Sequence, residues 1–217
     1  MMNVKIGMDE HVFICGGTGS GKTVLAEVYL SNVPSMVVKL DSKLECFERM
    51  KKGEPIWRGL ENADVQIIET LSELPTVEKD RIIYAPIEEE MTEDYYNALA
   101  DWVYRKTDCI LWIDELMTVC PNAFKVPLQF RKLMTRGRFI NSVCWICTQR
   151  PSEIPSIFMA NSQHFFIYNM NLPQDRKKIS EVTGCKEFNE ILPKYVFRYS
   201  YIGSNTSMKG KLNLKRG

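Results

Sequence analysis

The sequence lacks an apolar run long enough to cross a membrane, and its first five residues lack the apolar stretch of a secretory signal. It also lacks a strong excess of charge: the formal net charge of +1 excludes a globally basic nucleic-acid binder. Histidine is scarce, and the one Cys-x-x-C pair, Cys144 and Cys147, has no second pair and no histidine nearby. We therefore expect no membrane span and no zinc site, with thiols kept reduced in the cytoplasm.

A complete phosphate-loop signature, G-x-x-x-x-G-K-T, occupies residues 16–23. Its members are Gly16, Gly17, Thr18, Gly19, Ser20, Gly21, Lys22 and Thr23. An apolar run precedes it and helix-forming residues follow it, which is the strand-loop-helix context that the motif requires. Glycines there let backbone N–H groups approach a polyphosphate at the positive end of a helix. We expect these residues to bind ATP, with Lys22 at the β- and γ-phosphates and Thr23 on Mg²⁺.

Strand and helix patterns alternate along most of the chain. They predict strands at 11–15, 36–40, 65–68, 81–84, 109–113, 143–147 and 165–168, with helices at 23–31, 45–51, 92–103 and 124–138. This order predicts an α/β fold with a doubly wound, mainly parallel sheet and a ligand outside the carboxyl ends of the strands. We divide the chain into a core, 1–171, and a short α+β extension, 172–217, packed on or next to it. The extension is predicted to hold short helices at 175–182 and 188–192, a strand at 195–201 and a basic tail from Ser204.

Polar residues follow two of the predicted buried strands and indicate hydrolysis as well as binding. Asp114 ends the apolar run 109–113 and is the candidate second ligand of Mg²⁺. Glu115 follows and can accept the proton of an attacking water. A helix N-cap is the alternative interpretation of this acidic pair. Gln149 ends the strand that we place beside the phosphate-loop strand, where its amide can contact the γ-phosphate or the attacking water.

Basic and acidic residues are separated along the sequence. Residues 121–150 contain Lys125, Arg131, Lys132, Arg136, Arg138 and Arg150 but no acid, whereas residues 88–94 are rich in acids. The last residues add Lys209, Lys211, Lys215 and Arg216. Such separation indicates one face that meets an anion, although a solvated helix face explains each stretch equally well. The aromatic residues Trp57 and those at 195–201 fit either a core or a docking surface.

The segments GGTGSGKT, LWIDE and CTQRPSEIP, in this order and at these spacings, resemble the FtsK/HerA group of DNA-pumping P-loop ATPases. The segments VVKLDSK and RGRFINSVCWICTQRP agree with it, and the similarity covers residues 12–171. Within that group the chain is most similar to viral genome-packaging ATPases. The resemblance implies an ASCE-type, RecA-like core that hydrolyses ATP with Mg²⁺ to translocate double-stranded DNA. It assigns Lys22, Thr23, Asp114, Glu115 and Gln149 the roles given above.

The same resemblance implies a homo-oligomeric ring, a pentamer or hexamer, in which each subunit offers an arginine to its neighbour's nucleotide. A viral member would also dock on a capsid or portal-vertex protein in the host cytoplasm. Bacterial members carry their arginine just after the segment matching 160–162, where this chain has Gln163-His164-Phe165. Arg136 and Arg138 are therefore the first candidates for that arginine, with Arg150 as a third.

Contacts to DNA and the choice of cargo stay open at this point. Lys43, Lys51, Lys52, Arg58 and the segment 121–127 are candidates for gripping DNA. A conjugation, secretion or filamentous-phage assembly ATPase of the same group is the first alternative function. A nucleoside or nucleotide kinase is the second, disfavoured because no arginine-rich lid is evident. A non-catalytic nucleotide-binding module is the third.

Overall fold

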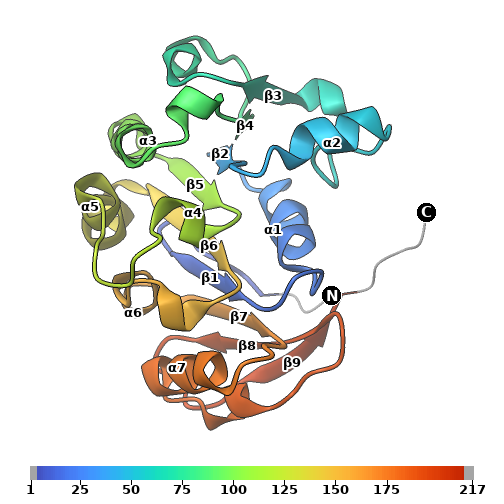
Figure 1. The fold of residues 1–217 in the computed structure, drawn as a ribbon, viewed down its shortest axis with the longest axis vertical. Coiled ribbons are helices and arrows are strands. Elements are labelled where there is room, and N and C mark those ends of the chain that lie inside the picture. Colours follow the sequence, from blue (N-terminus) through green and yellow to red (C-terminus); the bar gives the residue numbers. More distant parts are fainter. Residues whose placement is uncertain (1–3, 213–217) are drawn as a thin grey trace.

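One continuous sheet of nine strands organises the computed structural model, which describes residues 4–212. The strands are β1 (Val12–Cys15), β2 (Met36–Leu40), β3 (Val65–Ile68), β4 (Arg81–Tyr84), β5 (Cys109–Ile113), β6 (Val143–Thr148), β7 (His164–Tyr168), β8 (Val196–Tyr201) and β9 (Met208–Lys211). Their order across the sheet is β3-β4-β2-β5-β6-β1-β7-β8-β9 (Figure 1). Strands β3 to β7 in that order pair in parallel, and β8 and β9 continue the sheet antiparallel. The predicted doubly wound, mainly parallel α/β fold is confirmed.

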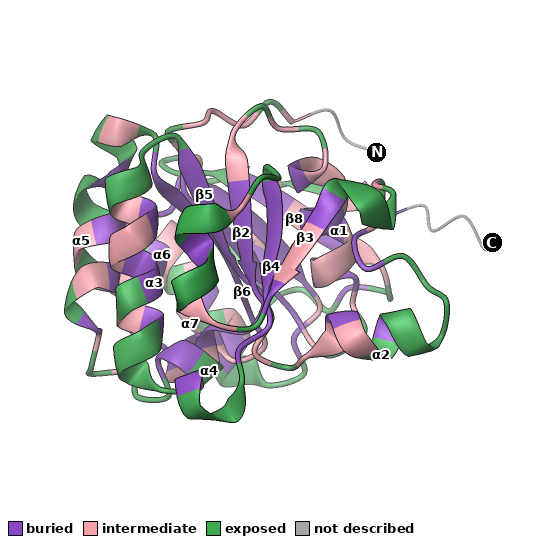
Figure 2. Cartoon of the chain, turned by 90° about the horizontal axis from the view of Figure 1, so that it is seen from above, coloured by how far each residue is buried: buried purple, intermediate pink, exposed green. Residues whose placement is uncertain are grey.

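Helices cover both faces of this sheet. They are α1 (Lys22–Leu30), α2 (Glu45–Lys51), α3 (Glu93–Lys106), α4 (Leu116–Val119), α5 (Leu128–Arg136), α6 (Ile157–Ala160) and α7 (Pro173–Thr183), joined by short 3₁₀ turns. Leu25 and Leu30 of α1 pack on the face formed by Val12 and Ile14 of β1. The helices α3 to α7 pack on the opposite face, and the central strands between the two layers are buried (Figures 1 and 2).

The alternation of side chains along a strand explains the Cys-x-x-C pair. Residues three apart in a strand point to opposite faces of the sheet. Cys144 accordingly lies in the core under α3 and α5, and Cys147 lies in the core under α1. The two thiols therefore cannot share a metal ion, and burial raises the pKa of each.

Several predicted boundaries were wrong. The helix predicted over 124–138 starts only at Leu128, because a residue that precedes a proline, here Val126 before Pro127, is disfavoured in helical conformation. It ends at Arg136, and residues 137–140 form a 3₁₀ helix. The helix predicted at 188–192 is a 3₁₀ helix over Lys186–Asn189, and Pro193 lies just beyond it. The predicted tail contains β9, whereas Lys215 and Arg216 lie outside the described residues.

The structure also shows where Trp57 and the aromatic residues at 195–201 lie, which the sequence left undecided between core and docking surface. Trp57 is fully buried, packs against Trp112 with ring centroids 5.2 Å apart, and donates from its indole N–H to Glu27 O. In β8, Phe197 and Tyr199 are buried while Tyr201 is 43% exposed. Trp57 therefore belongs to the core, and β8 presents only one of its aromatic rings to solvent.

Candidate active site

The phosphate loop connects β1 to α1 at the edge of the sheet where the parallel strands end. Gly16 must be glycine, because a Cβ there would lie 2.5 Å from the Cβ of Tyr168. Gly21 precedes α1 with a φ of 107° and gives the helix no side-chain cap. The first N–H groups of α1 thus have no acceptor within the helix and face the loop, as a phosphate site requires. The Lys22 ammonium donates to the carbonyls of Gly16 (2.7 Å) and Gly17 (3.1 Å), so it lies inside the loop.

Thr23 and Asp114 come together although 91 positions separate them in the sequence. Thr23 is the second residue of α1, and Asp114 follows the end of β5. The Thr23 hydroxyl donates to Asp114 Oδ1 over 2.9 Å. A hydroxyl and one carboxylate are an oxygen donor set that fits Mg²⁺, which takes its remaining ligands from substrate phosphates and water. Within residues 4–212 there is no cluster of three or more acidic, histidine or cysteine side chains that could hold a metal alone.

Glu115 and Gln149 form a chain of hydrogen bonds that reaches the phosphate loop. Gln149 Nε2 donates to Glu115 Oε2 over 3.1 Å, and Thr18 Oγ1 donates to Gln149 Oε1 over 2.7 Å. Strand β6, which ends just before Gln149, pairs with β1 on one side and β5 on the other, and this brings the three residues to one place. Glu115 occupies the N-cap position of α4, but its side chain makes no cap hydrogen bond. The carboxylate is thus directed to the site and does not serve the helix.

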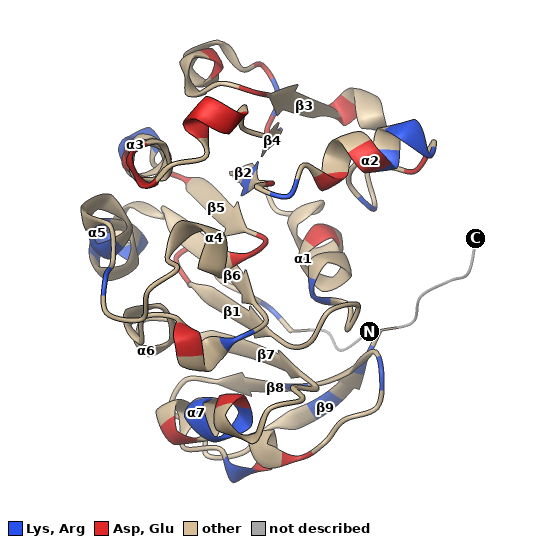
Figure 3. Ribbon diagram, in the orientation of Figure 1, with Lys and Arg blue, Asp and Glu red and all other residues tan. Residues whose placement is uncertain are grey.

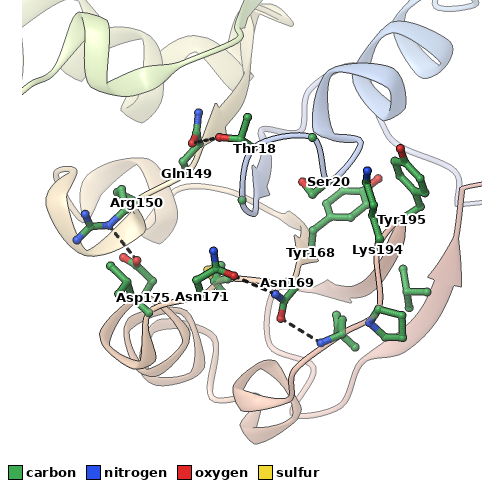
Figure 4. A pocket seen from close by; sticks show the side chains of 17 residues that line it. Thr18, Ser20, Gln149, Arg150, Tyr168, Asn169, Asn171, Asp175, Lys194 and Tyr195 are labelled. Atoms are coloured by element: carbon green, nitrogen blue, oxygen red, sulfur yellow. Dashed lines mark hydrogen bonds and ion pairs between the residues drawn. The ribbon is translucent and has the colours of Figure 1, made fainter.

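A cavity of about 410 Å³ opens beside the loop (Figure 4). The loop residues 17–20 form one wall, and residues 192–196, which lead into β8, form the other. Asn169 joins the walls, because its carbonyl accepts from Gly17 N and its side-chain oxygen accepts from Leu192 N. Tyr195 also lines a second cavity, of about 260 Å³, on the α1 side of the loop. This wall was not predicted from the sequence, although the aromatic residues at 195–201 begin within it.

The three candidate arginines occupy two different places. Figure 3 shows the basic and acidic positions along the ribbon, with basic residues on α5. Arg136 and Arg138 are exposed and lie just before β6 begins, whereas the phosphate loop follows the end of β1, which is parallel to β6, so the two lie at opposite ends of these strands. Arg138 Nε donates to Asp9 O over 2.8 Å. Arg150 instead lines the cavity beside the loop, where it pairs with Glu153 and with the buried Asp175, 3.0 Å away. Neither Arg136 nor Arg138 can therefore reach the phosphate loop of the same chain.

No protein-family profile and no curated protein matches the sequence. Solved structures do match it. The genome packaging NTPase B204 from Sulfolobus turreted icosahedral virus 2, in complex with ATP-γ-S, superposes with a TM-score of 0.74 at 19% identity, covering 96% of this chain and all of that one. The chain has the fold of the B204 NTPases. B204 of Sulfolobus turreted icosahedral virus, a DNA-packaging ATPase, gives a TM-score of 0.72 at 20% identity over 94% of this chain and 97% of that one.

A third similar structure is that of Thermomonospora curvata EccC, ATPases 2 and 3, in complex with a signal sequence peptide. It gives a TM-score of 0.58 at 12% identity, over 98% of this chain and 39% of that one. The resemblance inferred from the motifs is thus confirmed for the fold. No helix within residues 4–212 has the length and apolar character to span a membrane.

Proposed function

We propose that this chain is an ATP-hydrolysing motor that translocates double-stranded DNA to package a viral genome. One observation supports the enzymatic part above all: Lys22, Thr23, Asp114, Glu115 and Gln149 meet at one edge of the sheet. They do so in the fold of an NTPase that has been solved with ATP-γ-S and with AMPPCP. The choice of cargo and the viral setting follow B204, which is described as a DNA-packaging ATPase.

Hydrolysis follows from the positions of these side chains. The phosphates of ATP would take over the contacts that Lys22 now makes with the loop carbonyls. Mg²⁺, which Thr23 and Asp114 would hold, supplies positive charge to the phosphate oxygens. Glu115 takes a proton from water as the water oxygen bonds to the γ-phosphorus, and the bond from that phosphorus to the ADP oxygen breaks. Gln149 contacts both Thr18 and Glu115, so it can relay the state of the γ-phosphate to the general base.

The proposal includes a homo-oligomeric ring, a pentamer or hexamer. Arg136 and Arg138 are exposed at the edge remote from their own phosphate loop, so either could serve only a neighbour's nucleotide. The loop 120–127 begins one short helix after Glu115 and carries Phe124, which is 95% exposed. Opening and closing of the site could move this loop against DNA. Docking on a capsid or portal-vertex protein in the host cytoplasm is the remaining part of the proposal.

A protein cargo is the second candidate, because EccC was solved with a signal sequence peptide. Hydrolysis measured with and without duplex DNA at low salt separates the two. For a DNA motor we expect stimulation by duplex DNA and a rate per subunit that rises with protein concentration. A constant rate from a monomer under ATP, with no effect of DNA, would contradict the motor proposal.

The E115Q variant tests whether the site is catalytic at all. General-base catalysis contributes about 10²- to 10⁴-fold, so E115Q should lose at least about 10²-fold in kcat while still binding ATP. An unchanged rate would favour the non-catalytic module. Transfer of phosphate to a nucleoside or nucleotide faster than hydrolysis would favour the kinase.

A further inference from the structure

The turn that follows β2 is held in one conformation. Leu44 N–H donates to Asp41 O over 3.0 Å, which closes the turn over residues 41–44. Leu44 has a φ of 56°, a left-handed conformation that is uncommon for a residue other than glycine. The buried Asp41 then accepts from Cys46 N over 2.8 Å, at the start of α2. The turn is therefore fixed at both ends, and the directions of its side chains are set.

This turn is attached to the segment that carries the general base. Ser42 Oγ and Thr118 Oγ1 lie 2.9 Å apart, and Thr118 Oγ1 donates to Glu115 O over 2.8 Å. A hydroxyl has one proton, so Ser42 must be the donor to Thr118. Lys43 lies beside Ser42, and its ammonium is 3.5 Å from Glu115 Oε2. Ser42 thus contacts Thr118, whose hydroxyl binds the Glu115 carbonyl, and Lys43 contacts the Glu115 carboxylate.

The two oxygens of Glu115 differ in their surroundings. Oε2 is contacted by Lys43 and by Gln149, which donates from Nε2 over 3.1 Å. Oε1 is buried and has no hydrogen-bond partner among the described residues. One donor comes from the turn after β2 and the other from the residue after β6, and together they hold Oε2 in place, whereas Oε1 receives no donor from any residue that the structure describes. Loss of either donor would remove one of the two contacts that hold Oε2, and the carboxylate could then rotate away from its present orientation.

We propose that Lys43 is a positioning residue for Glu115, acting with Gln149 to hold its carboxylate in the orientation that accepts a proton from the attacking water. The inference rests on the proposed ATPase function and adds a residue to it. It also separates Lys43 from the other lysines that the sequence made candidates for DNA contact, because its ammonium is directed at the carboxylate of the active site. The Lys43 side chain is 45% exposed, so its replacement should leave the fold intact.

Steady-state hydrolysis by K43M, K43R and K177M tests the proposal. Lys177 is the matched control, since it is an exposed lysine of α7 that pairs with Glu181 and lines neither cavity beside the phosphate loop. Misplacing a catalytic group by about 1 Å can cost about 10²-fold, so K43M should lose about 10- to 100-fold in kcat with KM for ATP within about 2-fold. K43R should recover most of the rate because it keeps the cation, and K177M should match wild type.

A double variant identifies the route of the effect. If Lys43 acts through Glu115, adding K43M to E115Q should not lower the residual rate further. A further loss in that background would overturn the proposal, as would a K43M rate equal to wild type. A raised KM with unchanged kcat would show a phosphate-binding lysine, and loss only of stimulation by duplex DNA would show a DNA contact. Each of these results also overturns it. Absence of ATP hydrolysis by wild type would instead refute the proposed function.

Discussion

The buried His11 should make the protein acid-sensitive below pH 6.5, and the size of the effect follows from its contacts. Its Nδ1 accepts from Cys144 N–H over 2.9 Å, so this nitrogen carries no proton, and Nε2–H donates to Met134 O over 3.1 Å. Burial, and secondarily the positive charge of Arg138, lowers the pKa of His11 from 6.5 to about 4. Protonation of Nδ1 would break the Cys144 hydrogen bond and bring two N–H groups face to face.

The sign of the pH dependence is fixed by this lowered pKa. Between pH 6.5 and 4 the unfolded chain binds a proton on His11 that the folded chain does not, so acid favours unfolding. The stabilisation is complete above pH 6.5 and is lost as the pH falls through 4. With those two pKa values, His11 alone should remove about 2 kcal/mol between pH 7.5 and pH 5, and about 3 kcal/mol below pH 4.

Urea unfolding of wild type and H11N at pH 7.5 and pH 5 measures the effect. Asparagine keeps an acceptor for Cys144 N–H and cannot titrate, and the carboxylates contribute equally to both proteins. H11N should be less stable at pH 7.5 by about 1–3 kcal/mol, because Met134 O loses its donor. Wild type should then lose about 2 kcal/mol more than H11N on acidification. Equal losses in the two proteins would refute the reasoning.

Three further predictions concern packing, the nucleotide pocket and the ring. Gly137→Ala should lower stability by about 3 kcal/mol in thermal unfolding, since its Cβ would lie 2.0 Å from the Ser142 carbonyl oxygen, and a near-wild-type Tm would contradict that contact. Tyr195→Ala should raise KM for ATP about 10-fold at constant kcat, because stacking on a base contributes about 1–3 kcal/mol; equal KM values would exclude Tyr195 from the nucleotide site. If Arg138 acts in trans, R138A should lose about 10³-fold or more in kcat, and mixing it with E115Q subunits should restore activity. A mixture as inactive as its parts would exclude Arg138.

The parts of the fold that follow from local sequence were predictable. Strands β2, β3, β4 and β5 have the predicted bounds, because each is rich in apolar and β-branched residues, and β5 is an uninterrupted apolar run that is buried along its whole length. The phosphate loop and the Asp114-Glu115 pair could be found for the same reason, since each follows such a run. The division of the chain at residue 171 and the catalytic roles of these residues stay predictions.

What escaped prediction depends on contacts between distant segments. Residues 208–211 form β9 although they hold two lysines, because the exposed edge of β8 offers them backbone partners. The wall at 192–196 lies beside the phosphate loop because β8, which follows it, pairs with β7. Asn169, which bonds to this wall, has no sequence signal that distinguishes it from an ordinary turn residue. From the sequence, Lys43 cannot be distinguished from a surface lysine. The pairing of β2 with β5 brings its turn beside Glu115.

The position of β6 between β1 and β5 also sets the distance between the phosphate loop and Glu115. Neighbouring strands lie about 4.8 Å apart, so the phosphate loop and Glu115 are carried by strands about 10 Å from each other. Gln149 spans this gap by touching Thr18 on one side and Glu115 on the other. Asparagine has the same amide on a side chain one methylene shorter and could reach only one of the two. At this position the length of the side chain, as much as its chemistry, decides whether nucleotide and general base are in communication.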